Sequence, residues 1–363
     1  MDRTQQRNYG VDLFRIVAMI MVVGLHVLGR GGVLEAAKGD FPAYAMSWWI
    51  ETACYGAVNC FALVSGFVGL RSRHKFSNLA YLWIQVVFTM LLMQTVDFIF
   101  VSETFSRGKL FVSFIPIFSR YYWYFTDYAI LFLLMPMLNA AVNNLSKKTI
   151  SIMLVVVGAL FCTSSFFPGQ VFDKDPFQIR SGYSSMWLAY VYLIGAFVAK
   201  YGLLEKLKSV FLLLIYFGSV TLAWGSKLLL ERLPDRVTHY IAANSLIKYN
   251  SPLILISALA LLLFFVRLNN MPRFVCGIIG FVSPLTFGVY IIHLHELVWE
   301  WLAKRFVFLT EQPLHIMILG IVAAIAAIFV GCLILDCARH YLFKLLRVRK
   351  ALNAIENKIM REK

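Results

Sequence analysis

The stretch from Val11 to Gly29, VDLFRIVAMIMVVGLHVLG, decides the fold, because it is an apolar run long enough to cross a bilayer. It nevertheless carries three ionisable residues, Asp12, Arg15 and His26. At about 100° per residue, Arg15 and His26 project from nearly one face of a helix, about 16 Å apart along its axis. Asp12 lies one turn before Arg15 and can pair with it. Charged groups in a spanning helix usually face a protein interior or a watery cavity, so we expect this stripe to be the functional site.

The composition predicts a membrane protein throughout. Of the 363 residues, 60% are hydrophobic and 15% are charged, and the mean hydropathy is +0.73. A soluble domain of this size carries more charge. The apolar residues come in repeated blocks of about 20, which predicts an all-α integral membrane protein. The first block is not followed by a small-residue cleavage site, so we expect no signal peptide.

The hydropathy pattern predicts about ten transmembrane helices. They fall at residues 11–29, 44–70, 77–101, 121–144, 150–167, 183–199, 210–230, 250–266, 275–301 and 314–336. The apolar stretch KLFVSFIPIF, residues 109–118, is too short to span and predicts a re-entrant or interfacial helix. We divide the chain into a transmembrane domain at residues 1–338 and a basic tail helix at residues 339–363.

Both termini are predicted to be cytoplasmic. Ten spans put them on the same side, and that side carries most of the Lys and Arg residues. This orientation explains the net charge of +15, so we expect the lipid bilayer and not nucleic acid as the partner of these charges, with the basic tail along the anionic inner leaflet. The six cysteines lie within or beside apolar segments and form no CxxC pair, so we predict neither a metal site nor a disulfide.

The topology also predicts the depth of each polar residue. Segments 121–144 and 275–301 bring polar and aromatic side chains to the outer face beside His26: Trp123, Tyr124, Asp127, His293, His295 and Glu296. Basic side chains gather with Arg15 near the inner face: Arg71, Arg73 and Lys75.

Four stretches resemble the membrane acyltransferase 3 family, in the expected order. DLFRIVAMIMVVGLH (12–26) is similar to the family's first helix, in which His follows a basic residue by eleven positions. NCFALVSGF (59–67) resembles its second-helix pattern, and YYWYFTDYAILFLLMPMLN (121–139) resembles its Trp-rich fourth helix. SPLTFGVYIIHLH (283–295) resembles its Ser, Tyr and His helix near the C-terminus.

The resemblance implies a multi-pass enzyme of the bacterial inner membrane. Such enzymes move an acyl group, most often acetyl from cytoplasmic acetyl-CoA, onto a sugar hydroxyl of a surface glycan or its lipid-linked precursor. Acetyl-CoA would then be the co-substrate, with no metal. Two features depart from the family pattern. Its RxxR motif is replaced here by the run Arg71-Ser72-Arg73-His74-Lys75. We also expect no extracytoplasmic esterase-like domain of the kind that some members carry, so we expect this chain to act alone or with a partner in glycan assembly.

The candidate catalytic residues are Asp12, Arg15 and His26. His26 can act as the base that takes a proton from an attacking hydroxyl, or it can accept the acyl group itself. The alternative is a buried His bonded to a backbone carbonyl. Arg15 can bind the phosphates of CoA, or it can only pair with Asp12 and hold helices together. Arg71, Arg73 and Lys75 are candidate contacts to the CoA nucleotide, the alternative being charge that only orients the protein.

The remaining candidates concern the acceptor. His293 and Glu296 lie one turn apart and could bind the acceptor, support His26 or hold a metal, although HExxH is absent. Asp127, with Trp123 and Tyr124, could bind a sugar by stacking and hydrogen bonding, or belong to an interfacial aromatic belt. Ser65 and Gly66 predict close helix packing.

A different class of function remains as the alternative, a transporter or flippase for a lipid-linked sugar or small molecule. Its intramembrane charges would gate a pathway and drive no chemistry. The sequence offers neither inverted repeats nor evident helix pairs broken by Gly or Pro, and we interpret this as favouring the enzyme. Release of free thiol from acetyl-CoA separates the two classes.

Overall fold

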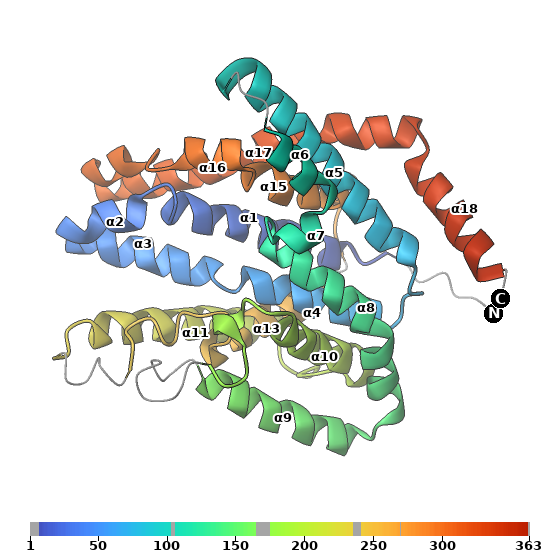
Figure 1. Ribbon diagram of the computed structural model, residues 1–363. Helices are drawn as coiled ribbons and strands as arrows, with labels where there is room; N and C mark the ends of the chain where they lie inside the picture. Colours follow the sequence, from blue (N-terminus) through green and yellow to red (C-terminus); the bar gives the residue numbers. More distant parts are fainter. Residues whose placement is uncertain (1–6, 103–105, 165–174, 235–240, 269, 362–363) are drawn as a thin grey trace.

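The computed structural model describes residues 7–102, 106–164, 175–234, 241–268 and 270–361, which form a bundle of helices without strands (Figure 1). The long helices are α1 (Tyr9–Leu28), α3 (Phe41–Cys54), α4 (Ala57–Gly69), α5 (Phe76–Asp97), α8 (Trp123–Asn144), α9 (Lys147–Thr163), α10 (Ser185–Tyr201), α11 (Ser209–Leu230), α13 (Pro252–Val266), α14 (Arg273–Val282), α17 (Leu314–Leu345) and α18 (Val348–Arg361). The short helices are α2 (Val33–Ala36), α6 (Arg107–Phe114), α7 (Pro116–Ser119), α15 (Thr286–His293) and α16 (Glu296–Leu302). The described residues also form one-turn segments: η1 (Ala37–Gly39), η2 (Phe98–Ser102), η3 (Arg180–Gly182), η4 (Ser283–Leu285) and η5 (Val307–Glu311).

The predicted fold class is confirmed, whereas the number of spans is not settled at ten. Seven helical segments among the described residues are long and apolar enough to cross a membrane: Tyr9–Leu28, Phe41–Gly69, Phe76–Val101, Trp123–Asn144, Ser209–Leu230, Arg273–His293 and Leu314–Leu345. Shorter helices, α9, α10 and α13, form at the other three predicted segments. Residues 165–167 of the fifth predicted segment lie outside the described residues. Ten spans with cytoplasmic termini stay a prediction.

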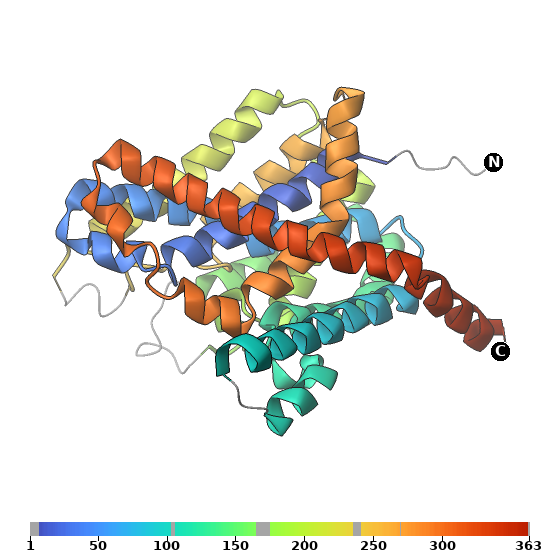
Figure 2. The ribbon, with the colours of Figure 1, turned by 90° about the horizontal axis from the view of Figure 1, so that it is seen from above.

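Helix α1 is the central helix of the bundle. It packs against α3, α4, α13, α14, α15 and α17, and 72% of its apolar window is buried, compared with 22% for α17. The start of α1 and the helix α18 lie at the same end of the molecule in both views (Figures 1 and 2). Because other helices surround α1, its polar stripe faces protein and not lipid, as the cost of burying charge in hydrocarbon requires.

Two predicted spans are divided into shorter helical elements. The segment 44–70 is divided between α3 and α4 at Tyr55 and Gly56, and the segment 275–301 is divided by η4 around Pro284 and again before α16. Proline lacks the N–H that continues a helix, and glycine is a poor helix former. At Tyr55, Gly56 and Ser283, however, the backbone stays in the right-handed helical region, so the absence of helix pairs broken by Gly or Pro stays a prediction.

The C-terminal helices differ from the predicted boundary at residues 338 and 339, which falls inside α17. Helix α17 continues to Leu345 because Asp336 and Arg339 neutralise each other, with N···O distances of 2.6 and 2.8 Å. Helix α18 then caps the start of α5. Glu356 accepts hydrogen bonds from the hydroxyl of Ser77 and the N–H of Phe76, and these hydrogen bonds lower the pKa of Glu356.

The stretch 109–118 forms two short helices and not one. Helices α6 and α7 meet at Ile115, directly before Pro116, where a residue preceding proline disfavours helical geometry. Neither is long enough to span a bilayer, in agreement with the prediction.

One glycine is required where α15 crosses α17. A Cβ atom on Gly288 would lie 1.9 Å from the carboxyl carbon of Asp336. We expect Gly288→Ala to displace Asp336 from Arg339 and to destabilise the protein by about 3 kcal/mol or more, since it combines overpacking with a disturbed buried ion pair. Thermal unfolding in detergent measures this. Gly277→Ala is the matched control, because nothing lies within 4 Å of its added Cβ; equal unfolding temperatures for both variants would contradict the packing described here.

Candidate active site

A cavity of about 730 Å³ lies along the polar face of α1, and we call it the central cavity. Arg15 and His26 both line it, as their spacing predicts, with walls from α1, α4, α5, α8, α15 and α16. Aromatic rings make up much of the remaining lining. The central cavity thus joins a guanidinium and an imidazole about 16 Å apart along one helix.

Asp12 holds the Arg15 end of the stripe. Its carboxylate accepts hydrogen bonds from Arg15 at 2.9 Å, from Arg7 at 2.5 Å and from the hydroxyl of Ser283 at 3.2 Å. The pairing of Asp12 with Arg15 was predicted, whereas the contacts from Arg7 and Ser283 were not. Arg15 donates only this one bond among the described residues, and its side chain is 31% exposed, so most of its five N–H groups can reach a ligand.

His26 belongs to a chain of hydrogen bonds that fixes its tautomer. Nδ1 of His293 lies 2.6 Å from the carbonyl oxygen of Val289, which can only accept, so this nitrogen carries a proton. Nε2 of a neutral His293 then accepts from Nδ1 of His26, at 2.9 Å. A neutral His26 therefore presents an unprotonated Nε2, which has no hydrogen-bond partner in the part of the chain that the structure describes.

Trp299 positions the His26 ring from the other side. The two rings meet edge to face, with centroids 5.1 Å apart. Arg30 fixes Trp299 in turn: it donates to the Trp299 carbonyl at 3.1 Å, and its guanidinium lies 5.4 Å from the Trp299 ring centroid. Glu300 pairs with Arg30 at 2.7 Å. The imidazole of His26 thus lies between two neighbours, His293 and Trp299.

The acceptor candidates on α8 separate into two groups. Trp123 and Tyr124 line the central cavity. Asp127 does not: its carboxylate accepts from Ser185 at 2.7 Å and lies 3.7 Å from Arg120. Its contacts join α8 to α10, which favours a packing role, so direct sugar binding by Asp127 has no geometric support here.

His293 and Glu296 do not act as a pair. His293 contacts His26, whereas the carboxylate of Glu296 points to Lys109, at 2.8 Å. Of the uses predicted for His293, support of His26 fits its position. Among the described residues no group of three or more His, Cys, Asp or Glu side chains is placed to hold a metal ion.

The three basic residues after α4 lie outside the central cavity. Arg71, Arg73 and Lys75 are exposed in the connection to α5, and Arg71 donates to the carbonyl of Ala199. Their predicted contact with the CoA nucleotide stays a prediction. Gly66 packs against α10, since a Cβ there would lie 1.9 Å from the Tyr192 carbonyl oxygen, as the small-residue pattern predicted.

Several lining residues escaped the sequence analysis. Besides Trp299, they are tyrosines from α8, from α15 and from the connections before α8, α10 and α13: Tyr121, Tyr128, Tyr183, Tyr249 and Tyr290. Tyr121 and Tyr128 fall in the aromatic stretch 121–139 and Tyr290 falls in SPLTFGVYIIHLH, both quoted above for the family resemblance, whereas no sequence pattern singled out Tyr183 or Tyr249.

A family model for the acyltransferase domain, acyltransferase 3, matches residues 8–337. The chain belongs to the membrane acyltransferase 3 family. The match begins at the N-cap of α1 and ends within α17, so it includes both ends of the polar stripe and every wall of the central cavity. Comparison with curated proteins and with solved structures gives no match.

Proposed function

We propose that this membrane acyltransferase transfers an acyl group, with acetyl as the first candidate, from cytoplasmic acyl-CoA to a hydroxyl of a surface glycan or its lipid-linked precursor. The single observation that carries the proposal is the chain from Val289 through His293 to His26, which leaves a lone pair on Nε2 of His26 at the cavity wall. We place the protein in the bacterial inner membrane, alone or with a partner in glycan assembly.

The reaction follows from this arrangement. Nε2 of His26 takes the proton of the acceptor hydroxyl while its oxygen attacks the thioester carbonyl. The C–S bond then breaks, and the imidazolium returns the proton to the departing thiolate, so that ester and free CoA form in balance. Throughout, Nδ1 of His26 remains hydrogen-bonded to His293. An acyl group carried on His26 would use the same nitrogen and is the alternative course.

Arg15 is the proposed contact for the CoA phosphates. Its free N–H groups lie at the end of the central cavity opposite His26, so a long donor anchored there can extend its thioester toward the imidazole. The glycan then approaches from the outer end. The acyl group crosses the bilayer in this arrangement without movement of the whole donor.

Arg15→Gln is expected to raise the KM for acetyl-CoA by about 10- to 100-fold, the value of a hydrogen bond to a charged group. Asp12 keeps Arg7 and Ser283 as partners in this variant, so folding is preserved. Steady-state kinetics in membrane vesicles measure the change. Arg273→Gln is the control, because Arg273 is exposed and outside the central cavity; an unchanged KM in Arg15→Gln would remove Arg15 from the donor site.

A transporter remains the second candidate, because the chain leaves the helix at His295, between α15 and α16, where Leu294 and Glu296 line the central cavity. Transporters build substrate sites from such broken helices. The purified protein, incubated with acetyl-CoA and a membrane extract that contains the acceptor, distinguishes the two. An acyltransferase releases free thiol in proportion to ester formed, whereas a transporter leaves acetyl-CoA intact.

A further inference from the structure

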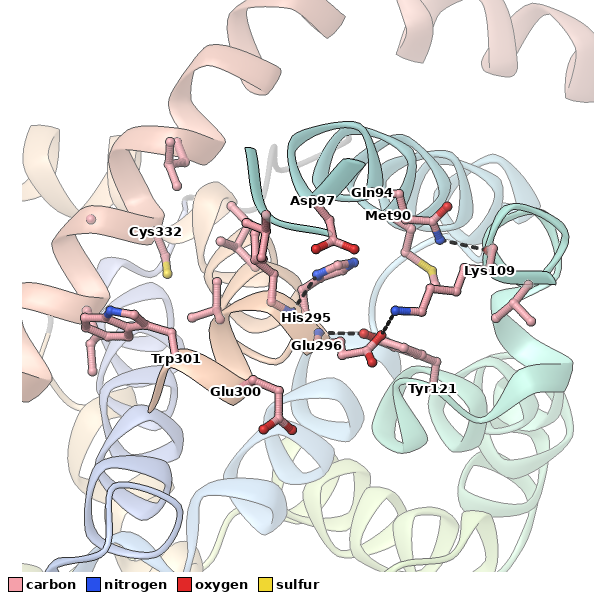
Figure 3. Close-up of a pocket in the computed structure, with 18 of the residues that line it drawn as sticks. Met90, Gln94, Asp97, Lys109, Tyr121, His295, Glu296, Glu300, Trp301 and Cys332 are labelled. Carbon is pink, nitrogen blue, oxygen red and sulfur yellow. Dashed lines mark hydrogen bonds and ion pairs between the residues drawn. The ribbon is translucent and has the colours of Figure 1, made fainter. Parts of the chain in front are cut away.

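A second, larger cavity of about 1200 Å³ lies between α5, α6, α16 and α17 (Figure 3). We call it the α5–α17 pocket. Its volume exceeds the range of about 300–1,000 Å³ usual for small-molecule sites, so it suits an extended ligand. Neither the donor nor His26 occupies it in the mechanism above, and its residues were not brought together by any sequence pattern.

Most of the pocket wall is apolar, and part of it lies on the outer surface of the bundle. Val101, Trp301 and Leu335 line it, and each exposes half or more of its surface. Leu335 lies on α17 and Val101 extends α5, two of the segments apolar enough to span the membrane. Such side chains face acyl chains in a bilayer, so an apolar chain can enter this pocket sideways from the membrane.

Polar side chains gather at the α6 and α16 end of the same pocket. Lys109 pairs with Glu296 at 2.8 Å, and this contact raises the pKa of Lys109. Asp97 lies beside His295 in Figure 3. Among the described residues, the cations that contact Glu296 and Glu300 are each engaged in an ion pair, Lys109 with Glu296 and Arg30 with Glu300. Carboxylates, an imidazole and aromatic rings suit a hydroxyl-rich uncharged head group better than a phosphate.

The polar end of the pocket adjoins the central cavity. Tyr121 and Glu296 line both cavities, and the N–H of Glu296 donates to the Tyr121 hydroxyl at 2.6 Å. These two residues therefore form a shared wall. A head group bound beside Glu296 lies next to the space that holds His26.

We propose that the α5–α17 pocket is the acceptor site and takes an amphiphile, an uncharged sugar carried on an apolar chain, laterally from the bilayer. The chain lies between α5 and α17, and a sugar hydroxyl passes the wall of Tyr121 and Glu296 toward His26. This inference rests on the proposed acyl transfer and adds the class of acceptor and its route.

The test uses a probe of that chemistry, dodecyl maltoside with a diazirine in its alkyl chain, on the full-length protein in lipid nanodiscs. Photolabelling is expected on α5 and α17 peptides. Gly331→Trp should reduce it at least tenfold, because Gly331 lines the pocket and nothing lies within 4 Å of its added Cβ. Gly218→Trp is the matched control on α11, equally open and outside the pocket, and should leave labelling unchanged.

Competition identifies the head group. Excess unlabelled dodecyl maltoside should prevent labelling, and dodecyl phosphate should not. Labelling that survives Gly331→Trp, or that dodecyl phosphate prevents equally well, would overturn the proposal. Photolabelling does not depend on acyl transfer by the enzyme, so binding and acetyl transfer are measured separately. In the transfer assay, dodecyl maltoside should be acetylated faster than maltose, and Gly331→Trp should abolish that preference. Transfer to neither sugar, with labelling as expected, would count against the proposed function alone.

Discussion

Replacing His26 by glutamine is expected to lower acyl transfer by about 10²- to 10⁴-fold, the usual contribution of a general base. Glutamine keeps a hydrogen-bonding side chain of similar reach toward His293 but offers no titratable nitrogen to the central cavity. The initial rate of free-thiol release from acetyl-CoA, at equal amounts of protein in the membrane, measures the loss.

His315→Gln is the matched control for this variant. His315 is exposed near the start of α17 and lines neither cavity, so its replacement removes one imidazole without touching the site. It should retain the wild-type rate. A His26→Gln protein that releases thiol as fast as His315→Gln would show that His26 is the buried, structural histidine that the sequence left open.

Replacing His293 by leucine is expected to lower kcat by about 10²- to 10⁴-fold while the KM for acetyl-CoA stays unchanged. Without an acceptor beside Nδ1, neutral His26 is free to carry its proton on Nε2, and the base is lost from the cavity side. A wrong tautomer of a catalytic histidine in serine proteases costs about 10⁴-fold. The donor contact at Arg15 lies at the other end of the central cavity and is not affected.

His293→Gln provides the corresponding conservative variant. Its side-chain oxygen can still accept from Nδ1 of His26, so part of the lost rate should return. Equal rates for leucine and glutamine at this position, both near wild type, would rule out the hydrogen-bond chain as the source of the tautomer. A raised KM for acetyl-CoA in both would instead indicate a disturbed cavity.

The sequence predicted the part of the site that one helix determines. Helical geometry alone puts Arg15 and His26 on one face, because residues eleven apart differ by about three full turns. The partner of His26 could not be predicted to be His293, since 267 residues separate them and only tertiary packing of α15 on α1 brings them together. The predicted topology put His26 and His293 at a similar depth in the membrane. A similar depth does not show that two side chains are in contact.

Local charge misled the sequence analysis at the end of the last span, where two opposite charges pair one turn apart on the same helix. A basic tail was predicted to begin at Arg339, yet Arg339 pairs with Asp336 and the helix continues to Leu345. The α5–α17 pocket was not predicted from the sequence. Its walls come from segments far apart in the chain, and its polar end depends on Lys109, which the sequence places in a short apolar stretch without indicating which neighbour it meets.

The most direct test of the central claim is the O-acyl content of the native surface glycan, measured by NMR. It compares cells that carry the wild type, a deletion, His26→Gln or His315→Gln at matched membrane abundance. The account predicts that O-acyl signals vanish in the deletion and in His26→Gln and persist in His315→Gln. The sugar whose O-acyl signal disappears is then identified as the acceptor. Signals that vanish in the deletion but persist in His26→Gln would contradict the role of His26 as the base.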